Sequence, residues 1–216
     1  MKDTVCQIAY QVALQEGYFR IGLKTGWSGF VPGQFGMLEV PREDGVLLRR
    51  PFSFARQIGD LTEILYKKVG KGTTALARMA PGQEIRLLGP LGKGFSSESP
   101  GGDYVGVAGG YGIAPFLELA EQLRRNHRSL TLFYGARSVK DLLYLQELKA
   151  LGVKLHLTTV DGSAGETGLV TEAVGRVYSA QKPGLVACCG PTGLLKAVQQ
   201  WALPRGIACE LSVEET

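Results

Sequence analysis

A glycine-rich stretch in the middle of this 216-residue chain has the spacing of a phosphate-binding turn. Residues 105–115 read Val-Gly-Val-Ala-Gly-Gly-Tyr-Gly-Ile-Ala-Pro, and an apolar run typical of a helix follows over residues 116–123. Glycines let a diphosphate approach the main chain, and the free N–H groups at a helix start attract negative charge. The stretch therefore predicts a strand, a turn and a helix around a nucleotide. A plain structural turn is the alternative, because Pro115 stands where the usual fingerprint has its third glycine.

A second candidate lies earlier, where Arg50-Pro51-Phe52-Ser53 places a cation, a rigid turn, an aromatic ring and a hydroxyl in succession. An arginine fork pairs with a diphosphate, a phenyl ring packs against another ring system, and a hydroxyl bonds a ring nitrogen. These residue types suit a phosphorylated aromatic ligand. The alternative is an arginine on the rim of a β-barrel with no ligand.

The third candidate is Gly70-Lys71-Gly72-Thr73-Thr74, a glycine turn that opens a short helix. Gly72, Thr73 and Thr74 offer main-chain N–H groups and hydroxyl donors at a helix start, which again suits a phosphate. A helix that is merely capped is the alternative.

Two further loops follow predicted strands in the second half. Gly135-Ala136-Arg137-Ser138 suits the adenosine end of a nucleotide, with Arg137 and Ser138 near the ribose. Cys189-Gly190-Pro191 places a thiol at a strand end, beside a helix start. A small buried residue is the alternative for Cys189, because a nucleophile needs an activating base and no histidine is nearby in sequence.

Composition narrows the function classes. The chain is 44% hydrophobic and 20% charged with a net charge of +4, so it is an ordinary globular protein without the charge of a nucleic-acid binder. No apolar run predicts a secretion signal or a membrane span. The four cysteines form no Cys-x-x-Cys pair, which predicts a reduced, cytoplasmic chain with no metal site of its own. His127 and His156 have no ligand-like spacing and are interpreted as structural or surface residues.

The elements that must position these motifs fall into two classes, and residues 1–98 are predicted to form a small antiparallel β-barrel. This first half has short β-rich segments separated by glycine turns and one brief helix. The predicted strands are 5–14, 18–23, 37–40, 53–56, 61–67 and 85–88, and the helix is 73–79.

Residues 99–216 alternate between strands and helices instead, which predicts a parallel α/β sheet that binds nucleotides at the carboxyl ends of its strands. The predicted strands are 105–108, 129–134, 154–160, 185–189 and 207–211, and the helices are 114–125, 142–151, 171–179 and 194–202.

Together these motifs resemble the ferredoxin–NADP reductase superfamily over nearly the whole chain. Residues 50–53 are similar to its flavin motif Arg-x-Tyr-Ser with Phe52 in place of tyrosine, and residues 70–74 to its flavin diphosphate segment. Residues 109–115 and 189–191 match its Gly-Gly-x-Gly-Ile/Thr-Ala/Thr-Pro and Cys-Gly-Pro motifs. The resemblance implies a Greek-key barrel that binds FAD and an α/β domain that binds NAD(H), with the two rings meeting at the domain seam.

Within the superfamily the chain is most similar to the electron-transfer subunits of B-type dihydroorotate dehydrogenases. The stretches that carry this likeness are residues 48–53, 66–73 and 209–215. In that family a similar ending leads into a cysteine-rich tail that binds a 2Fe–2S cluster. The sequence given stops at Thr216 without those cysteines, through truncation or because this homologue lacks them. The resemblance also implies an FMN-containing dehydrogenase catalytic subunit as partner, in pyrimidine biosynthesis.

The resemblance implies hydride transfer between nicotinamide and flavin, after which electrons pass on to the partner. It assigns the flavin phosphates to Arg50, a contact near flavin N5 to Ser53, and a place beside the nicotinamide to Cys189. The remaining cofactor residues that it implies are Pro51, Phe52, Tyr66, Lys67, Gly72, Thr73, Thr74, Gly109, Gly110, Gly112, Ile113, Pro115, Arg137, Gly190 and Pro191.

Several choices remain open at this point. NAD is favoured over NADP, because a 2′-phosphate usually requires two cations and only Arg137 stands in its loop. The alternatives to the dehydrogenase subunit are a free-standing ferredoxin or flavodoxin reductase and the gamma-type subunit of a sulfide dehydrogenase or hydrogenase. A regulatory subunit that binds flavin without turnover is the alternative outside the enzymes.

Overall fold

The computed structural model describes residues 2–15, 17–40, 48–98 and 101–213. The chain divides into two compact units, Met1–Gly94 and Phe95–Thr216. The sequence predicts a similar division at residue 98. Glu214 and Glu215, which belong to the family-like ending, lie outside the described residues.

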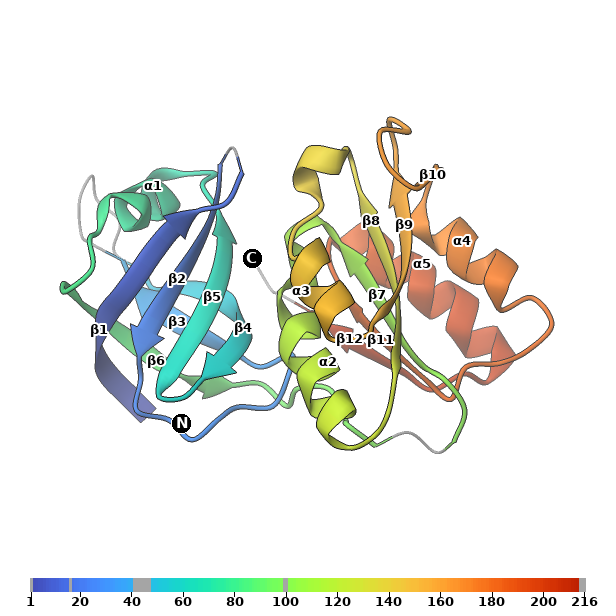
Figure 1. The fold of residues 1–216 in the computed structure, drawn as a ribbon, viewed down its shortest axis with the longest axis horizontal. Coiled ribbons are helices and arrows are strands. Elements are labelled where there is room, and N and C mark those ends of the chain that lie inside the picture. The colour runs from blue at the N-terminus through green and yellow to red at the C-terminus, as the bar shows by residue number, and fades with distance from the viewer. Residues whose placement is uncertain (1, 16, 41–47, 99–100, 214–216) are drawn as a thin grey trace. The chain divides into compact units, whose positions relative to one another are not determined.

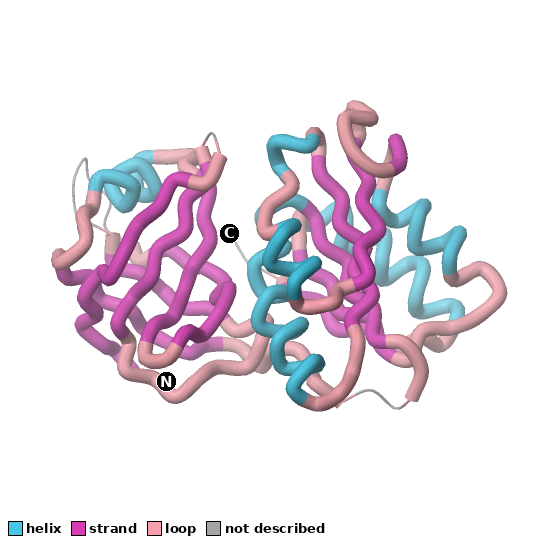
Figure 2. The backbone as a smooth tube through the Cα atoms, viewed as in Figure 1, coloured by secondary structure: helices cyan, strands magenta, loops and turns pink. Residues whose placement is uncertain are grey.

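The first unit is a closed barrel of six antiparallel strands, which confirms the predicted fold class (Figures 1 and 2). Its strand order is β1-β2-β5-β4-β3-β6, so the chain does not simply pass from neighbour to neighbour. A short helix, α1 (Lys71–Arg78), follows β5. The strands are β1 (Lys2–Ala13), β2 (Tyr18–Lys24), β3 (Phe35–Glu39), β4 (Arg50–Ile58), β5 (Leu61–Lys67) and β6 (Glu84–Leu91).

Alternate residues of the barrel strands fill its interior, as expected for strands with one buried face. Phe54 is fully buried, and its ring meets Trp27 edge-on at 5.7 Å and Phe30 at 4.9 Å between ring centroids. Phe52 and Tyr66 belong to the same core. These aromatic contacts fix β4, the strand that begins at Arg50.

The second unit is a six-stranded sheet in which all pairings are parallel, with strand order β10-β9-β8-β7-β11-β12. The strands are β7 (Tyr104–Gly109), β8 (Leu130–Ala136), β9 (Lys154–Thr159), β10 (Glu166–Thr167), β11 (Leu185–Cys189) and β12 (Cys209–Ser212). The helices are α2 (Ala114–Arg125), α3 (Leu145–Ala150), α4 (Val170–Val177) and α5 (Thr192–Ala202). Three 3-10 turns, η2 (Gly110–Ile113), η3 (Val139–Asp141) and η4 (Leu203–Arg205), complete the described elements.

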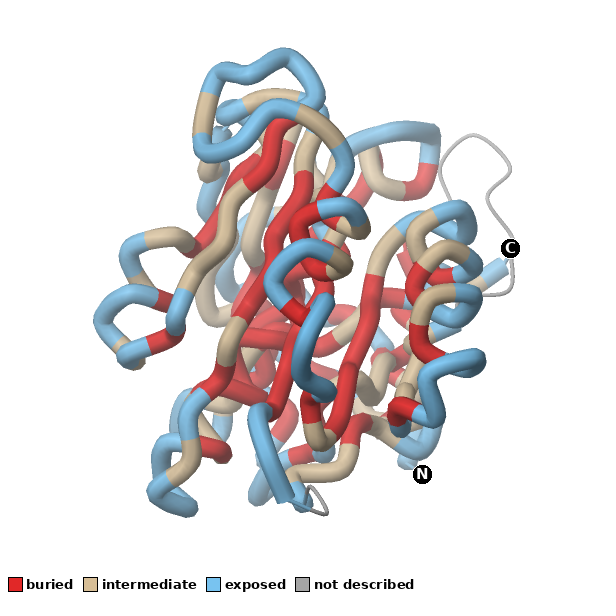
Figure 3. Tube along the Cα trace, turned by 90° about the vertical axis from the view of Figure 1, so that its right-hand side faces the viewer, coloured by how far each residue is buried: buried red, intermediate tan, exposed pale blue. Residues whose placement is uncertain are grey.

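Helices cover both faces of this sheet, with α2 and α3 on one side and α4 and α5 on the other (Figure 1). Val105 and Val107 of β7 and Val186 of β11 are fully buried in the core formed with α4 and α5. On the opposite face Gly106 allows close packing, because a Cβ atom there would lie 2.7 Å from the ring of Phe116 in α2. The central strands β7, β8 and β11 are buried along most of their length, and Figure 3 shows the helices buried on one side only.

Two differences from the sequence prediction have local causes. The two-residue strand β10 is too short to leave a periodic signal. The helix expected from residue 142 begins at Leu145, because Tyr144 has a left-handed backbone with φ of 58°. Such a residue cannot lie inside a right-handed helix.

Strand order also locates the nucleotide site expected for such a sheet. From β7 the chain proceeds to β8, β9 and β10 on one side, and then returns to β11 and β12 on the other. Parallel sheets bind ligands at the carboxyl ends of the two strands where this reversal occurs. In this unit those are the ends of β7 and β11.

Candidate nucleotide-binding sites

The turn after β7 and the turn after β11 pack directly against each other. A Cβ atom on Gly112 would lie 2.4 Å from the carbonyl oxygen of Cys189, and one on Gly190 would lie 3.1 Å from the amide nitrogen of Gly109. Both glycines therefore allow a main-chain approach that any side chain would block. Two motifs that are about 80 residues apart in sequence thus meet at the strand-order reversal.

The turn after β7 has room for a ligand on its outer side. Gly110 has a positive φ of 56°, and no atom lies within 4 Å of the position that its Cβ would occupy. Tyr111 is half exposed, whereas Ile113 is fully buried and anchors the turn in the core. Pro115 lies in the first turn of α2, where a residue without an N–H group is tolerated. The missing third glycine is therefore compatible with this helix start.

Cys189 is the last residue of β11 and is buried, with 4% of its surface exposed. Its neighbour Cys188 belongs to the core on the α4 and α5 side, and burial raises the pKa of the Cys188 thiol. Since successive strand residues face opposite ways, Cys189 lies on the other face of the sheet. Cys189 lies beside Gly112 and Gly190, and its contact with a nicotinamide stays a prediction.

Tyr134, which sequence reasoning missed, connects two of these loops. Its buried hydroxyl lies 3.0 Å from the carbonyl oxygens of both Gly110 and Asp141, and it accepts a hydrogen bond of 3.0 Å from the amide of Leu143. Burial of a tyrosine requires a hydrogen-bond partner for its hydroxyl. A tyrosine directly before Gly135, at the end of a strand, was the available signal.

The loop after β8 is held by the loop after β9. The amide of Asp161 donates to the carbonyl of Arg137 over 3.2 Å, and the amide of Val139 donates to the hydroxyl of Ser163 over 2.8 Å. The Asp161 carboxylate accepts hydrogen bonds from the hydroxyl and amide of Ser163, which lower its pKa. Arg137 is exposed, and Ser138 caps η3 through its hydroxyl. Asp161 and Ser163 were not among the predicted site residues.

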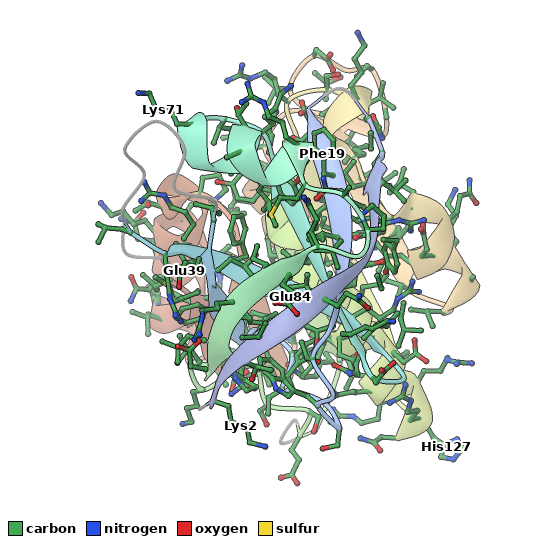
Figure 4. The ribbon with its side chains drawn as sticks, turned by 90° about the vertical axis from the view of Figure 1, so that its left-hand side faces the viewer. Lys2, Phe19, Glu39, Lys71, Glu84 and His127 are labelled. Carbon is green, nitrogen blue, oxygen red and sulfur yellow. The ribbon has the colours of Figure 1, made fainter. Side chains whose placement is uncertain are left out.

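In the barrel unit, Arg50 lies against the start of α1. A Cβ atom on Gly72 would lie 3.5 Å from Nε of Arg50 and 3.4 Å from Val40. Arg50 is exposed at the first position of β4, and Gly72 is the second residue of α1. Figure 4 shows Lys71 at the same helix start, with its side chain extending away from the barrel. The structure therefore brings together two motifs that sequence reasoning linked to phosphate.

The hydroxyl of Thr73 bonds to its own turn, and the expected contact of Thr73 with a flavin diphosphate stays a prediction. Its Oγ1 accepts hydrogen bonds from the amides of Val69 (2.9 Å) and Gly70 (3.1 Å), and its hydroxyl lies 3.1 Å from the carbonyl oxygen of Gly70. The side chain thus stabilises the turn that opens α1. Thr74, which also lies in the first turn, has a partly exposed side chain, and its amide donates to Gly70.

The aromatic residues of the flavin-like motif lie in or beside the barrel core. Phe52 is 9% exposed and meets the ring of Tyr66 edge-on at 5.9 Å, while Tyr66 stacks on Phe19 at 5.4 Å. Pro51 is exposed, and Ser53, which pairs with Phe35 of β3, is partly exposed. Contacts of Phe52, Tyr66 and Ser53 with a flavin ring stay predictions.

Lys67, at the end of β5, is tied to the barrel surface. Its Nζ donates to the hydroxyl of Tyr18 over 3.0 Å and lies 4.4 Å from the centre of the Tyr18 ring. A cation over a ring face is attracted electrostatically. A cofactor contact for Lys67 stays a prediction.

The described residues show neither a metal-ligand cluster nor a membrane-spanning helix. Among them no three His, Cys, Asp or Glu side chains gather as metal ligands would. Nor does any helix in the described ranges have the length and apolar character needed to cross a membrane.

Sequence comparison identifies relatives for both units. Residues 107–200 match the family described as the oxidoreductase NAD-binding domain. The chain is 33% identical over 188 residues to the dihydroorotate dehydrogenase B (NAD(+)) electron transfer subunit of Desulforamulus reducens, which covers 86% of this chain and 71% of that protein. It is 34% identical to the subunit of the same name from Listeria monocytogenes, over 92% of this chain and 79% of that one. The subunit of the same name from Enterococcus faecalis is 39% identical, over 85% of this chain and 71% of that one.

Solved structures share the two-domain fold. A structure of an NADH-dependent reduced ferredoxin–NADP oxidoreductase superimposes with a TM-score of 0.84 and 28% identity, over 99% of this chain and 77% of that chain. The structure of a ferredoxin NADP+ reductase from Neisseria gonorrhoeae, with bound FAD and NADP, has a TM-score of 0.78 and 21% identity. The match covers 99% of this chain and 100% of that one.

Proposed function

The chain belongs to the family of electron transfer subunits of dihydroorotate dehydrogenase B (NAD(+)), and from this premise we propose that it uses bound FAD to pass electrons between NAD(H) and a dehydrogenase subunit. The observation that carries the nucleotide half of this proposal is the meeting of the Gly109–Gly112 turn with Cys189 and Gly190 at the strand-order reversal.

The barrel fits FAD at the start of α1. Arg50 lies beside Gly72, where the first helical N–H groups have no acceptor within the helix. An arginine fork and these N–H groups are the donors that a diphosphate requires. Among the described residues, no carboxylate forms an ion pair with Arg50. We therefore assign Arg50, Gly72 and Thr74 to the flavin diphosphate, with Thr73 shaping the turn that presents them.

The second unit fits NAD(H) at the ends of β7 and β11. Gly109, Gly110 and Gly112 leave the main chain open to a diphosphate, and the adjoining Gly190 and Pro191 complete the turn beside Cys189. The adjacent loop with Arg137 takes the adenosine. In this arrangement the glycine turn binds the diphosphate, and the thiol of Cys189 lines the nicotinamide pocket.

A flavin supplies hydride and single-electron chemistry, so the protein itself needs no acid–base pair. The residues of this chain bind and orient. Arg50 fixes the phosphate end of the flavin, Ser53 offers a hydrogen bond at the ring, and the glycine turn after β7 positions the nicotinamide nucleotide.

The loop after β8 favours NAD over NADP. The loop after β8 carries two exposed cations, Arg137 and Lys140, but the carboxylate of Asp161 lies in the neighbouring loop, whose amide bonds to the Arg137 carbonyl. A 2′-phosphate near an ionised carboxylate loses affinity through like-charge repulsion. Rates of flavin reduction by NADH and NADPH test this directly, and a large preference for NADPH would overturn it.

The electron acceptor that we propose is a dihydroorotate dehydrogenase catalytic subunit, following the names of the relatives, and the family resemblance implies that this subunit contains FMN. A ferredoxin-linked acceptor is the second candidate, because the fold also matches the NADH-dependent reduced ferredoxin–NADP oxidoreductase at 28% identity. We place the protein in the cytoplasm. Its four cysteines are free thiols, which supports a reducing compartment.

Co-purification with an untagged dihydroorotate dehydrogenase catalytic subunit tests the partner. A stable complex in which NADH reduces the second flavin is the expected result. Rapid reduction of a ferredoxin by NADH, with no complex, would favour the second candidate.

A further inference from the structure

We propose that Tyr134 is a positioning residue for NAD(H). Its hydroxyl holds the turn after β7 and the loop after β8 in the geometry that binds the nucleotide diphosphate and ribose. The inference rests on the proposed function and deepens it, because it names a residue that shapes the site without belonging to any recognised motif.

The hydroxyl of Tyr134 joins two separate loops. It lies 3.0 Å from the carbonyl oxygen of Gly110, in the turn after β7, and 3.0 Å from that of Asp141, in the loop after β8. It also accepts from the amide of Leu143 at 3.0 Å. A tyrosine hydroxyl has one hydrogen atom, so the two carbonyls share it, and the oxygen accepts in addition. Loss of the hydroxyl therefore removes a hydrogen-bond partner from residues in both loops.

The contact with Gly110 sets the direction of the next N–H group. In a planar trans peptide the C=O and N–H bonds point in opposite directions. Because the Gly110 carbonyl points to the buried Tyr134 hydroxyl, the N–H of Tyr111 points away from it. Gly110 and Tyr111 begin η2, so the N–H of Tyr111 has no acceptor within this turn. Tyr111 is also half exposed. The hydroxyl therefore orients a donor suited to a phosphate oxygen.

The contacts with Asp141 and Leu143 fix the second loop. This loop ends at Tyr144, a buried residue with φ of 58°, which is an uncommon conformation for a bulky side chain. Such a backbone persists only when its surroundings hold it. The Leu143 amide that donates to Tyr134 is one such hold, directly before the strained residue. Arg137 and Ser138 lie in the same loop and depend on its position.

Tyr134→Phe tests the inference, because it removes the hydroxyl and keeps the ring. Tyr178→Phe is the matched control. This variant loses the 3.0 Å hydrogen bond that the Tyr178 hydroxyl donates to the carboxylate of Asp103. Asp103 precedes β7, at the opposite end of the sheet from the glycine turn. The probe is ADP-ribose, which carries the diphosphate and ribose but no nicotinamide and so needs no redox step. Calorimetric titration of the FAD-loaded protein measures its Kd.

We expect the Kd of ADP-ribose to rise about five- to thirtyfold in Tyr134→Phe, as for loss of a buried hydrogen-bonding group, and to stay within twofold in Tyr178→Phe. Equal Kd values in Tyr134→Phe and the parent, or equal weakening in both variants, would overturn the inference alone. A parent protein that does not bind ADP-ribose would overturn the proposed nucleotide site and the inference with it.

Hydrogen exchange of the parent gives a second test that needs no variant. The Leu143 amide should exchange slowly before any nucleotide is added, because it already donates to the Tyr134 hydroxyl. Fast exchange at Leu143, comparable with the exposed amides of neighbouring loops, would contradict the role of Tyr134 whether or not Tyr134→Phe folds.

Discussion

At the scale of single residues, exposure and neighbouring atoms decide which side chains are available to the phosphates that we propose. Arg50 is exposed at the barrel rim yet lies beside Gly72, so removing its guanidinium leaves the core intact. Cys6 and Cys188 are fully buried and contribute packing, whereas Cys189 is at a strand end beside the glycine turn. The cysteines thus differ in role according to their position in the fold.

Arg50→Ala should weaken FAD binding more than it weakens the fold. Loss of a charged hydrogen bond to the diphosphate costs about 1.5–3 kcal/mol, which is about ten- to hundredfold in Kd. Flavin content of the purified variant, measured by absorbance, checks this. Arg86→Ala is the control, since the Arg86 side chain forms a surface ion pair with Asp3 at 3.8 Å. Flavin content equal to the parent in Arg50→Ala would contradict the assignment.

Thiol ionisation should limit stability at alkaline pH. Burial raises the pKa of the Cys6 thiol to about 11, from an ordinary value of 9.0. Between these values the unfolded chain releases this proton and the folded chain keeps it, so the free energy of unfolding falls as pH rises above about 9. Denaturant titrations at pH 8 and pH 10 should show this loss, and Cys6→Ala should reduce its size. An identical pH dependence in Cys6→Ala would show that another group is responsible.

At the scale of elements, the proposed binding sites lie at turns and helix starts. The turn after β7 is held in place by the turn after β11, which packs on it through glycines. The start of α1 is stabilised by Thr73, whose hydroxyl accepts hydrogen bonds from two amides of its own turn. In both places the element is stabilised by contacts that no ligand provides. The turns of both proposed sites are therefore stabilised by the protein's own contacts.

Gly112→Ala should destabilise the second unit. The added Cβ would lie 2.4 Å from the Cys189 carbonyl oxygen, so main chain must move, at a cost of about 1–3 kcal/mol or more. Gly193→Ala is the matched control in α5, where no atom lies within 4 Å of the new Cβ. Alanine inside a helix should stabilise it slightly, by up to about 1 kcal/mol. Melting temperatures that move in the same direction for both variants would contradict this packing.

Thr73→Val should weaken the start of α1, since both amides lose their acceptor, at a cost of about 1 kcal/mol. The melting temperature and the Kd of FAD measure the effect on the fold and on the site. Thr73→Ser keeps the hydroxyl and should restore both values. Failure of serine to restore them would mean that the methyl group matters instead.

At the scale of the whole molecule, sequence patterns predict the architecture well because each unit has its own period. Short strands with glycine turns predict the barrel, and strand–helix alternation predicts the parallel sheet, so the motifs fall on the correct elements. The boundaries of β5, β11 and α2 match the expected ranges because turn residues, glycines or proline flank them.

What the sequence could not show depends on contacts between distant residues. The approach of Gly112 to Cys189 and of Arg50 to Gly72 follows from strand order, which periodicity does not encode. The hydroxyl of Tyr134 and the carboxylate of Asp161 become visible only when neighbouring loops are in place. Site residues outside motifs are therefore the part that requires a structure.

The visible spectrum of the FAD-reconstituted protein, recorded before and after anaerobic addition of NADH, tests electron transfer from NAD(H) to flavin most directly. A yellow protein that NADH bleaches, while Arg50→Ala retains little colour, is the expected result. A protein that stays colourless after incubation with FAD, or that remains yellow with excess NADH, would contradict the function proposed for this chain.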